Sequence, residues 1–280
     1  MAFIDVNGAR LAWQQMGEGP DLLLVHGLAT NRAFWFGAAT ELQRSHRVTL
    51  FDLRGHGYSS RPPGGYSARD FGADIVGLMD GLGIARAALA GHSYGSAAAL
   101  EAAGLAPGRV THLALFDTRV ARLQPLMRLH DTPRITDVER EISATSDHDW
   151  AALPQVGYHF LEAAARMRLS GKTPQARDDF APFGEGRGAA RAAKHWLDLL
   201  DHTTARAELD APGMHADAIA TLRMPVLLMY AEFSRCLHSG ERLRELLPHA
   251  RYEFVEQAGH FFPVSQPHRV LAALAALLGA

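Results

Sequence analysis

Residues 91–95 of this chain read Gly-His-Ser-Tyr-Gly, a Gly-x-Ser-x-Gly pattern that constrains the fold more than any other segment. A strand-like apolar stretch precedes it at residues 85–90, and an alanine-rich run with strong helix propensity follows at residues 96–103. A tight turn from a strand into a helix brings two backbones together, and the two glycines have no side chains to obstruct that approach. The pattern therefore predicts a strand-to-helix turn that exposes the Ser93 hydroxyl in front of a helix N-terminus, as a nucleophile requires.

Alternating strands and helices are expected on both sides of this turn. Such alternation indicates a mostly parallel sheet with right-handed crossovers, and Asn7-Gly8 predicts an opening hairpin. The expected strands are residues 3–6, 9–14, 21–25, 47–52, 85–90, 110–116, 225–230 and 250–255. The expected helices are residues 33–44, 68–82, 239–247 and a last one that begins near residue 267.

The middle of the chain interrupts this alternation. Residues 118–222 are helical or irregular in character, show no convincing strand, and are too many for a simple connection. We therefore predict a core domain formed by residues 1–117 and 223–280, with a helical cap at residues 118–222 over the C-terminal edge of the sheet. The length of 280 residues is sufficient for one such domain with an insertion.

Composition argues against several classes of partner and location. A formal net charge of −2 gives no electrostatic reason to expect nucleic acid or an anionic membrane surface. No run of about 18 apolar residues is present, so no transmembrane helix is expected, and the first residues lack the pattern of a secretory signal. A single cysteine, Cys236, excludes an internal disulfide and fits a cytoplasmic location.

Four segments together make the chain similar to the α/β-hydrolase superfamily over nearly its whole length. They stand in the superfamily's order and spacing, and they are Val25-His26-Gly27, residues 52–59, residues 91–95 and Gly259-His260-Phe261. The resemblance implies an α/β fold in which helices flank a mostly parallel central sheet and a helical cap is inserted.

The resemblance also implies roles for individual residues. Ser93 matches the nucleophile, and His260 matches the general base on the loop after the last strand. The backbone N–H groups of Leu28 and Tyr94 match the two donors of the oxyanion hole. A serine hydroxyl is a poor nucleophile at neutral pH, so a neighbouring imidazole must accept its proton and later return it to the leaving group.

The acid of the triad departs from the superfamily's pattern. The usual Gly-x-x-Asp after the strand at residues 225–230 is replaced by Ala231-Glu232-Phe233-Ser234, and a serine cannot stabilise an imidazolium as a carboxylate does. Asp117, at the end of the preceding strand, is the favoured acid, as in some superfamily branches, and Glu232 is the alternative. In a third interpretation Asp117 only caps a helix or fixes a loop.

Aromatic residues near the nucleophile and in the insertion are candidates for the substrate pocket, because ligand sites are mostly apolar. The predicted substrate-binding residues are Phe34, Trp35, Tyr158, His159 and Trp196, each of which has core packing as its alternative role. Metal ligands are not expected, since no histidine pair at zinc-ligand spacing has a third partner. We expect Cys236 to be a buried, inert thiol.

These observations predict a cytoplasmic, cofactor-free serine hydrolase, a monomer or homodimer, that acts on a small-molecule substrate. It would cleave a carboxylic ester or lactone through a Ser-His-Asp triad and an acyl-enzyme intermediate. Two alternatives stay open. The same triad can cleave a carbon–carbon bond or transfer an acyl group to an acceptor other than water, and a hydrolase scaffold can instead serve as a ligand-binding receptor.

Overall fold

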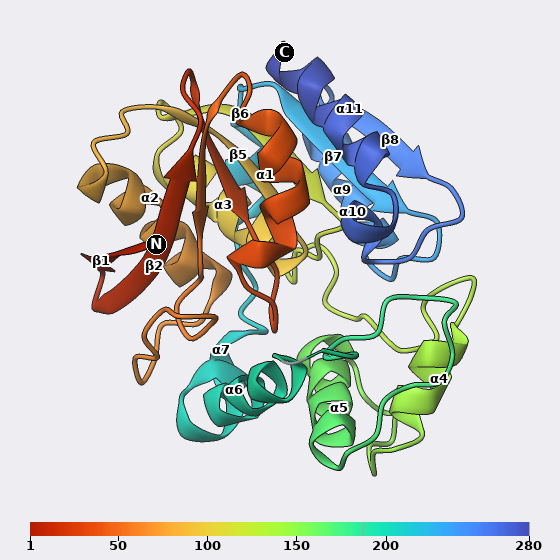
Figure 1. The fold of residues 1–280 in the computed structure, drawn as a ribbon. Helices are drawn as coiled ribbons and strands as arrows, with labels where there is room; N and C mark the ends of the chain where they lie inside the picture. The colour runs from red at the N-terminus through yellow and green to blue at the C-terminus, as the bar shows by residue number, and fades with distance from the viewer. Residues whose placement is uncertain (187, 280) are drawn as a thin grey trace.

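The structure is a computed structural model that describes residues 1–186 and 188–279. Within these residues, an eight-stranded sheet has the order β1-β2-β4-β3-β5-β6-β7-β8 (Figure 1). Its strands are β1 (Ala2–Val6), β2 (Ala9–Met16), β3 (Asp21–Val25), β4 (Arg47–Phe51), β5 (Ala87–His92), β6 (Val110–Phe116), β7 (Val226–Ala231) and β8 (Arg251–Val255). The eight strands predicted from the sequence are all present, with ends shifted by at most two residues.

The sheet is antiparallel only at its start. The hairpin β1–β2 turns at Asn7 and Gly8, which both adopt positive φ, and β2 then pairs antiparallel with β4. From β4 to β8 all pairs are parallel. The carboxyl ends of β3 and β5–β8 therefore lie along one edge of the sheet, where an α/β fold places its ligand.

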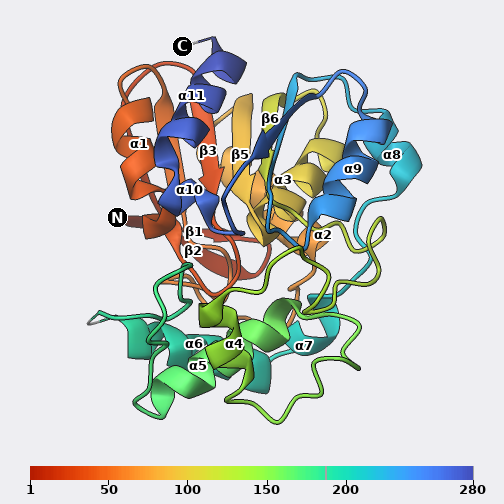
Figure 2. The ribbon, with the colours of Figure 1, turned by 90° about the vertical axis from the view of Figure 1, so that its right-hand side faces the viewer.

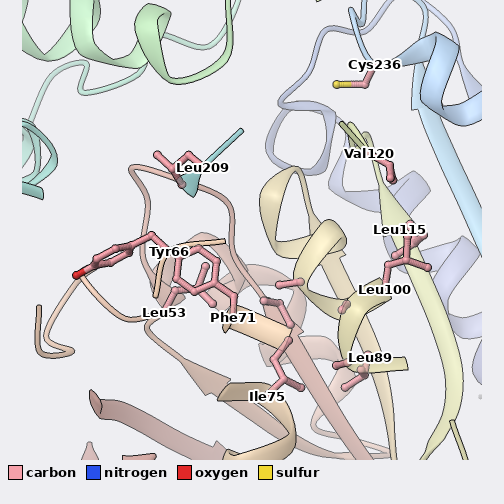
Figure 3. Packing of buried hydrophobic residues seen from close by; sticks show 14 of the residues in the cluster. Leu53, Tyr66, Phe71, Ile75, Leu89, Leu100, Leu115, Val120, Leu209 and Cys236 are labelled. Atoms are coloured by element: carbon pink, nitrogen blue, oxygen red, sulfur yellow. The ribbon is translucent and has the colours of Figure 1, made fainter. Parts of the chain in front are cut away.

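Helices cover both faces of the sheet, and the central strands are mostly apolar and buried on both faces. Alternate residues of β5 and β6, such as Leu89 and Leu115, pack under α2 (Ala68–Gly81) and α3 (Tyr94–Leu105) (Figure 3). The residues between them, such as Ala90 and Phe116, pack under α1 (Phe36–Leu42) and α11 (Pro267–Leu278). Strands buried on two faces account for the continuous apolar runs in the sequence.

The segment between β6 and β7 carries five helices in its described part. They are α4 (Asp137–Ser143), α5 (Gly157–Leu169), α6 (Ala189–His202), α7 (Ala205–Glu208) and α8 (Ala216–Ala220). Helices α4–α7 lie together beyond the carboxyl ends of the strands (Figures 1 and 2). In contrast, α8 lies beside α9 (Leu237–Leu246) on the flank of the sheet (Figure 2).

Two helices differ in detail from those expected. The expected helix at residues 33–44 begins as a 3-10 turn, η1 (Arg32–Trp35), capped by the Asn31 side chain, and continues as α1. A short helix, α10 (Phe262–Ser265), precedes α11.

Residues 187 and 280, in the predicted cap and the predicted core, lie outside the described residues. No described helix has both the length and the apolar character needed to cross a membrane.

Candidate active site

The Gly-x-Ser-x-Gly segment forms the expected sharp turn between β5 and α3. Ser93 has φ 56° and ψ −124°, a backbone conformation that residues other than glycine rarely adopt. The Ser93 N–H donates to the Phe116 carbonyl oxygen at 2.8 Å. A Cβ on Gly91 would lie 2.5 Å from the Gly95 carbonyl oxygen. A Cβ on Gly95 would collide with the carbonyl oxygens of the β3 end. Both glycines are therefore required by close backbone approach.

The His260 ring bridges Ser93 and Asp117. Its Nε2 lies 2.9 Å from the Ser93 Oγ, and its Nδ1 lies 2.6 Å from the Asp117 Oδ2. Because a carboxylate only accepts hydrogen bonds, we assign the ring proton to Nδ1, which leaves Nε2 to accept the Ser93 hydroxyl proton. The arrangement can thus remove a proton from Ser93 and hold the resulting imidazolium beside a negative charge.

Asp117, rather than Glu232, is the carboxylate that reaches His260. Its side chain is fully buried, and its Oδ1 accepts the Ala231 N–H at 3.1 Å. Its Oδ2 accepts the Ser234 hydroxyl at 2.7 Å in addition to His260. Glu232 points elsewhere, because its carboxylate accepts the Gln257 N–H at 2.7 Å. Ser234, at the superfamily's usual acid position, therefore supports the carboxylate that stands at the end of β6.

The environment of His260 favours its protonated form. Burial lowers the pKa of His260, but the hydrogen bond and charge of Asp117, together with the Cys236 side chain, outweigh burial and raise this pKa above the ordinary value of 6.5. The neutral ring that acts as a base is therefore favoured at alkaline pH.

Replacement of Ser234 by alanine tests its support of Asp117. The Ser234 Oγ donates to Asp117 and accepts the Cys236 N–H at 2.9 Å, so its loss leaves two buried polar groups short of a partner. We expect Ser234→Ala to destabilise the fold by about 1–3 kcal/mol. The pKa of His260 should also rise, because the carboxylate loses a donor that competes with the ring. Denaturant unfolding measures the first effect, and the acid limb of the kcat/KM–pH profile measures the second.

The control for that variant is Ser265→Ala, which removes the hydroxyl of an exposed serine in α10. It should change neither stability nor the pH profile. An unchanged acid limb in Ser234→Ala would show that the hydroxyl does not act on the Asp117–His260 pair.

Two backbone N–H groups lie where the resemblance places an oxyanion hole. Leu28 and Tyr94 both line the cavity beside Ser93. The Tyr94 N–H is the first of α3, and the first N–H groups of a helix have no partner within it. Gly27 permits this geometry, because a Cβ there would lie only 3.1 Å from the Ser93 Cβ. Their role as oxyanion donors stays a prediction.

Two buried histidines support the loops of the site. Leu53 donates its N–H to the His26 Nε2 at 3.0 Å, which ties the loop after β3 to the loop after β4. The His92 Nε2 lies 2.8 Å from the His260 carbonyl oxygen. Burial lowers the pKa of His92 well below its usual range, so the ring is neutral and its Nε2–H donates to that carbonyl. His92 thereby holds the loop that carries His260.

A cavity of about 180 Å³ opens above Ser93 and His260. Most of its wall is apolar, and residues from the core, α5 and the loop before α6 share in it. The apolar and aromatic lining residues include Leu28, Tyr94, Met127, Val156, Tyr158, Phe160, Leu161, Phe180, Phe233 and Phe261. The site therefore lies between the sheet and the inserted segment.

Of the five predicted substrate-binding residues, only Tyr158 lines this cavity. Trp35 is 1% exposed and packs in the core near Phe116, because the 3-10 turn directs its ring onto the sheet. Trp196 is 2% exposed, on the buried face of α6, with its ring 6.0 Å from the His56 ring.

The other two predicted aromatic residues lie one layer behind the cavity wall. Phe34 stacks on His92 at 4.8 Å between ring centroids, and His159 stacks on Tyr158 at 4.2 Å. Phe34, Trp35, His159 and Trp196 therefore do not line the cavity, and their part in substrate binding stays a prediction. Residues that are adjacent in sequence, such as Tyr158 and His159, can face the cavity and the layer behind it, and the residue type does not indicate which.

Charged side chains also line the cavity, and the sequence carried no signal for them. The Arg119 Nη1 lies 3.5 Å from the Asp210 Oδ1, and Arg235 pairs with Glu139. Glu101 and Asp179 line the cavity too, and among the described residues neither forms an ion pair. Asp179 lies next to the loop that carries His260, since a Cβ on Gly259 would lie 3.0 Å from the Asp179 Oδ2. The described wall thus carries more carboxyl than guanidinium groups, and burial raises the pKa of both Glu101 and Asp179.

Comparison with known proteins finds similarity over most of the chain. The family model of the alpha/beta hydrolase fold matches residues 20–267. A pimeloyl-[acyl-carrier protein] methyl ester esterase from Aliivibrio salmonicida is 37% identical over 273 residues, which cover 89% of this chain and 88% of that protein. A 2-(acetamidomethylene)succinate hydrolase from Mesorhizobium japonicum is 26% identical over 281 residues, which cover 97% and 92%.

Other relatives match over a shorter stretch, and the chain spans about a third of their length. One is the dihydrolipoyllysine-residue acetyltransferase component of an acetoin cleaving system from Pseudomonas putida, 39% identical over 113 residues, which cover 40% of this chain and 30% of that protein. Among solved structures, the enol-lactonase from Burkholderia xenovorans superposes over 100% of both chains with a TM-score of 0.69 and 22% identity. At this level of identity, the similarity shows a shared fold and nothing more specific.

Proposed function

The chain belongs to the alpha/beta hydrolase fold family, and on this premise we propose that it is a serine hydrolase which cleaves a carboxylic ester or lactone. The observation that carries the proposal is the pair of hydrogen bonds by which His260 links Ser93 to Asp117. Acyl transfer requires a nucleophile, a base and an orienting acid that are joined by hydrogen bonds, and this is the arrangement of the three residues. The same completeness argues against a ligand-binding receptor, which would need no activated hydroxyl.

The proposed reaction proceeds in two halves. The Ser93 Oγ attacks the substrate carbonyl carbon while the His260 Nε2 accepts the hydroxyl proton, and Asp117 stabilises the imidazolium. The Leu28 and Tyr94 N–H groups bind the negative oxygen of the tetrahedral intermediate, and each such donor contributes about 3 kcal/mol. His260 then gives the proton to the leaving alkoxide. A water molecule, deprotonated by His260, releases the acyl group from Ser93.

Two features favour an ester or lactone substrate of moderate size. The mainly apolar cavity of about 180 Å³ suits a compact acyl or alcohol group. The relative from Aliivibrio salmonicida, 37% identical to this chain, is named as a methyl ester esterase. We further propose that residues 118–222 act as a cap, with α4–α7 above the cavity, which excludes bulk water and selects the substrate.

The test is a panel of esters and lactones that differ in charge. Because Glu101 and Asp179 face the cavity without an ion-pair partner in the described structure, an added carboxylate on the substrate meets like charge. We expect neutral esters to be hydrolysed, with kcat/KM on the order of tenfold or more above that of matched esters that carry a carboxylate. Initial rates with the paired substrates measure this ratio.

Asp179→Asn should reduce that preference, since it removes one of the two unpaired charges. The matched control is Glu185→Gln, an exposed carboxylate of the same segment that pairs with Arg177 outside the cavity. A faster rate with the carboxylate-bearing esters would contradict the charge argument. An absence of hydrolysis across the whole panel would instead contradict the proposed function.

A further inference from the structure

Three side chains that can ligate a metal ion meet beside the nucleophile. Asp117 follows β6, Cys236 follows β7 and His260 follows β8, and these strands are neighbours in the sheet. A carboxylate oxygen, the Cys236 Sγ and a ring nitrogen of His260 all lie within 4.8 Å of one another. Neighbouring parallel strands end at the same edge, so the cluster forms although its members are far apart in the sequence.

The Cys236 thiol forms only weak interactions within this cluster. Its side chain is 5% exposed and lines the cavity. The Cys236 N–H donates to the Ser234 Oγ, which fixes the backbone at the start of α9. Within the described residues, the thiol contacts the Met127 Sδ at 4.0 Å, a weak acceptor, and its side chain also interacts with the His260 ring. Because a thiol is a weak hydrogen-bonding group, a metal ion would displace only weak interactions from the sulfur.

We propose that Asp117, Cys236 and His260 form an inhibitory site for a borderline or soft divalent cation such as Zn²⁺. The inhibition rests on the proposed function, whereas the binding does not. A thiolate, an imidazole and a carboxylate are the ligands that Zn²⁺ uses in proteins, and three of them leave a fourth position for water from the cavity. Hard cations such as Mg²⁺ prefer oxygen ligands and do not suit this set.

Two of the three ligands, Asp117 and His260, need to move little to accept the ion. Zinc bonds of about 2.0–2.3 Å place neighbouring tetrahedral ligands about 3.4 Å apart. The His260 Nδ1 and the Asp117 Oδ2 are now 2.6 Å apart, so they must separate by under about 1 Å. The ion then takes the place of the proton that lies between these two atoms.

Proton accounting explains the inhibition. The thiol loses its proton to solvent when it ligates the ion. The ion displaces the Nδ1 proton, which is released to solvent from an imidazolium ring or is exchanged through solvent onto Nε2 of a neutral ring. The bound imidazole, with its Nδ1 on the metal, then carries its single proton on Nε2. That nitrogen faces the Ser93 Oγ and can no longer accept the hydroxyl proton, so the nucleophile stays unactivated. Asp117 is at the same time held by the ion instead of by the ring.

A second group of possible ligands, in the inserted segment, offers a contrast. His148, His159 and Glu162 also bring ligand atoms within 4.8 Å of one another. However, the Glu162 carboxylate is already bonded by Arg166 and Arg206, each with an N–O distance of 2.7 Å. Two guanidinium groups neutralise the carboxylate and repel a cation, so we expect no tight binding there.

Cobalt titration of the metal-free protein tests binding without any assay of activity. Co²⁺ is a spectroscopic substitute for Zn²⁺, and a thiolate ligand gives a sulfur-to-cobalt charge-transfer band in the near ultraviolet. We expect that band to saturate at one equivalent and Zn²⁺ to abolish it. Cys236→Ser should remove the band and weaken Zn²⁺ binding on the order of a hundredfold, since even outer-shell partners change metal affinity about 10- to 100-fold.

Two further variants complete the test. His148→Ala, in the second group, should leave the cobalt band intact. Cys236→Ala also removes the thiol, and thermal unfolding of both Cys236 variants shows whether loss of the band comes from a folding defect. In the ester assay, Zn²⁺ should inhibit the wild type reversibly, with chelator restoring activity, while Mg²⁺ should not. A wild type without the thiolate band, or equal Zn²⁺ affinity in Cys236→Ser, would overturn the site. An absence of ester hydrolysis, with the cobalt band still present, would contradict the proposed function and leave the metal site supported.

Discussion

Asp117→Asn is expected to lower kcat by about 10⁴-fold, because an asparagine can neither hold the productive tautomer of His260 nor stabilise its positive charge. The effect should be this large because Asp117 is the carboxylate 2.6 Å from the His260 Nδ1. Single-turnover rates with a neutral ester measure the loss in the chemical step. Denaturant unfolding of the same variant separates that loss from any change in stability.

The pH profile of this variant gives a second, independent reading. Asp117 raises the pKa of His260, and the neutral ring is the base, so wild-type kcat/KM should rise with pH to a midpoint above 6.5. Without the carboxylate the midpoint should move to lower pH, although the remaining activity is small. A structural role alone would lower activity without such a move.

Glu232→Gln is the matched control, since Glu232 was the alternative acid in the sequence. Its carboxylate accepts the Gln257 N–H and is not in contact with His260, so we expect little change in kcat. Equal, mild losses in Asp117→Asn and Glu232→Gln would mean that neither carboxylate orients the histidine.

Ser93→Ala is expected to lower kcat by about 10⁶-fold, the loss that follows when a triad nucleophile is removed. The Ser93 Oγ is the group 2.9 Å from the His260 Nε2, so its removal leaves the base without a proton to accept. Wild-type protein should react with a fluorophosphonate probe at neutral pH, and Ser93→Ala should not. Gel fluorescence after labelling reports this directly, even when the natural substrate is unknown.

Ser265→Ala serves as the control for labelling, because this exposed serine has no contact with the triad. It should label as the wild type does. Persistent labelling of Ser93→Ala would place the reactive serine elsewhere, and an unreactive wild type would favour the ligand-binding receptor over the hydrolase.

The course of the chain was predictable because its physical signals are local. Asn7-Gly8 predicts a hairpin from the positive φ that both residues adopt, and the apolar runs of β3 and β7 predict strands buried on two faces. Gly91 and Gly95 predict the turn at Ser93, because a side chain at either position would collide with neighbouring backbone. The triad acid was left open, because the choice between Asp117 and Glu232 depends on where two neighbouring strands end.

The lining of the cavity was much less predictable. Trp35 and Tyr158 are both aromatic, yet the first packs inside the core and the second faces the cavity. Arg119, Asp179 and Asp210 are far apart in the inserted segment, and they line one cavity only when that segment folds over the sheet. Residue type predicts burial in general, but the face of each element that turns toward the site is decided by packing.

The sequence by itself therefore determined the strands and the strand-to-helix turn, because backbone sterics and hydrophobic period act over a few residues. The resemblance to the superfamily supplied Ser93 and His260 as the proposed nucleophile and base. Only the tertiary structure decided that Asp117 reaches His260, that Ser234 supports it and that Cys236 joins them. These contacts join loops more than a hundred residues apart along the chain. Such distances close only when the parallel strands align, since the register of the sheet sets which loop ends become neighbours.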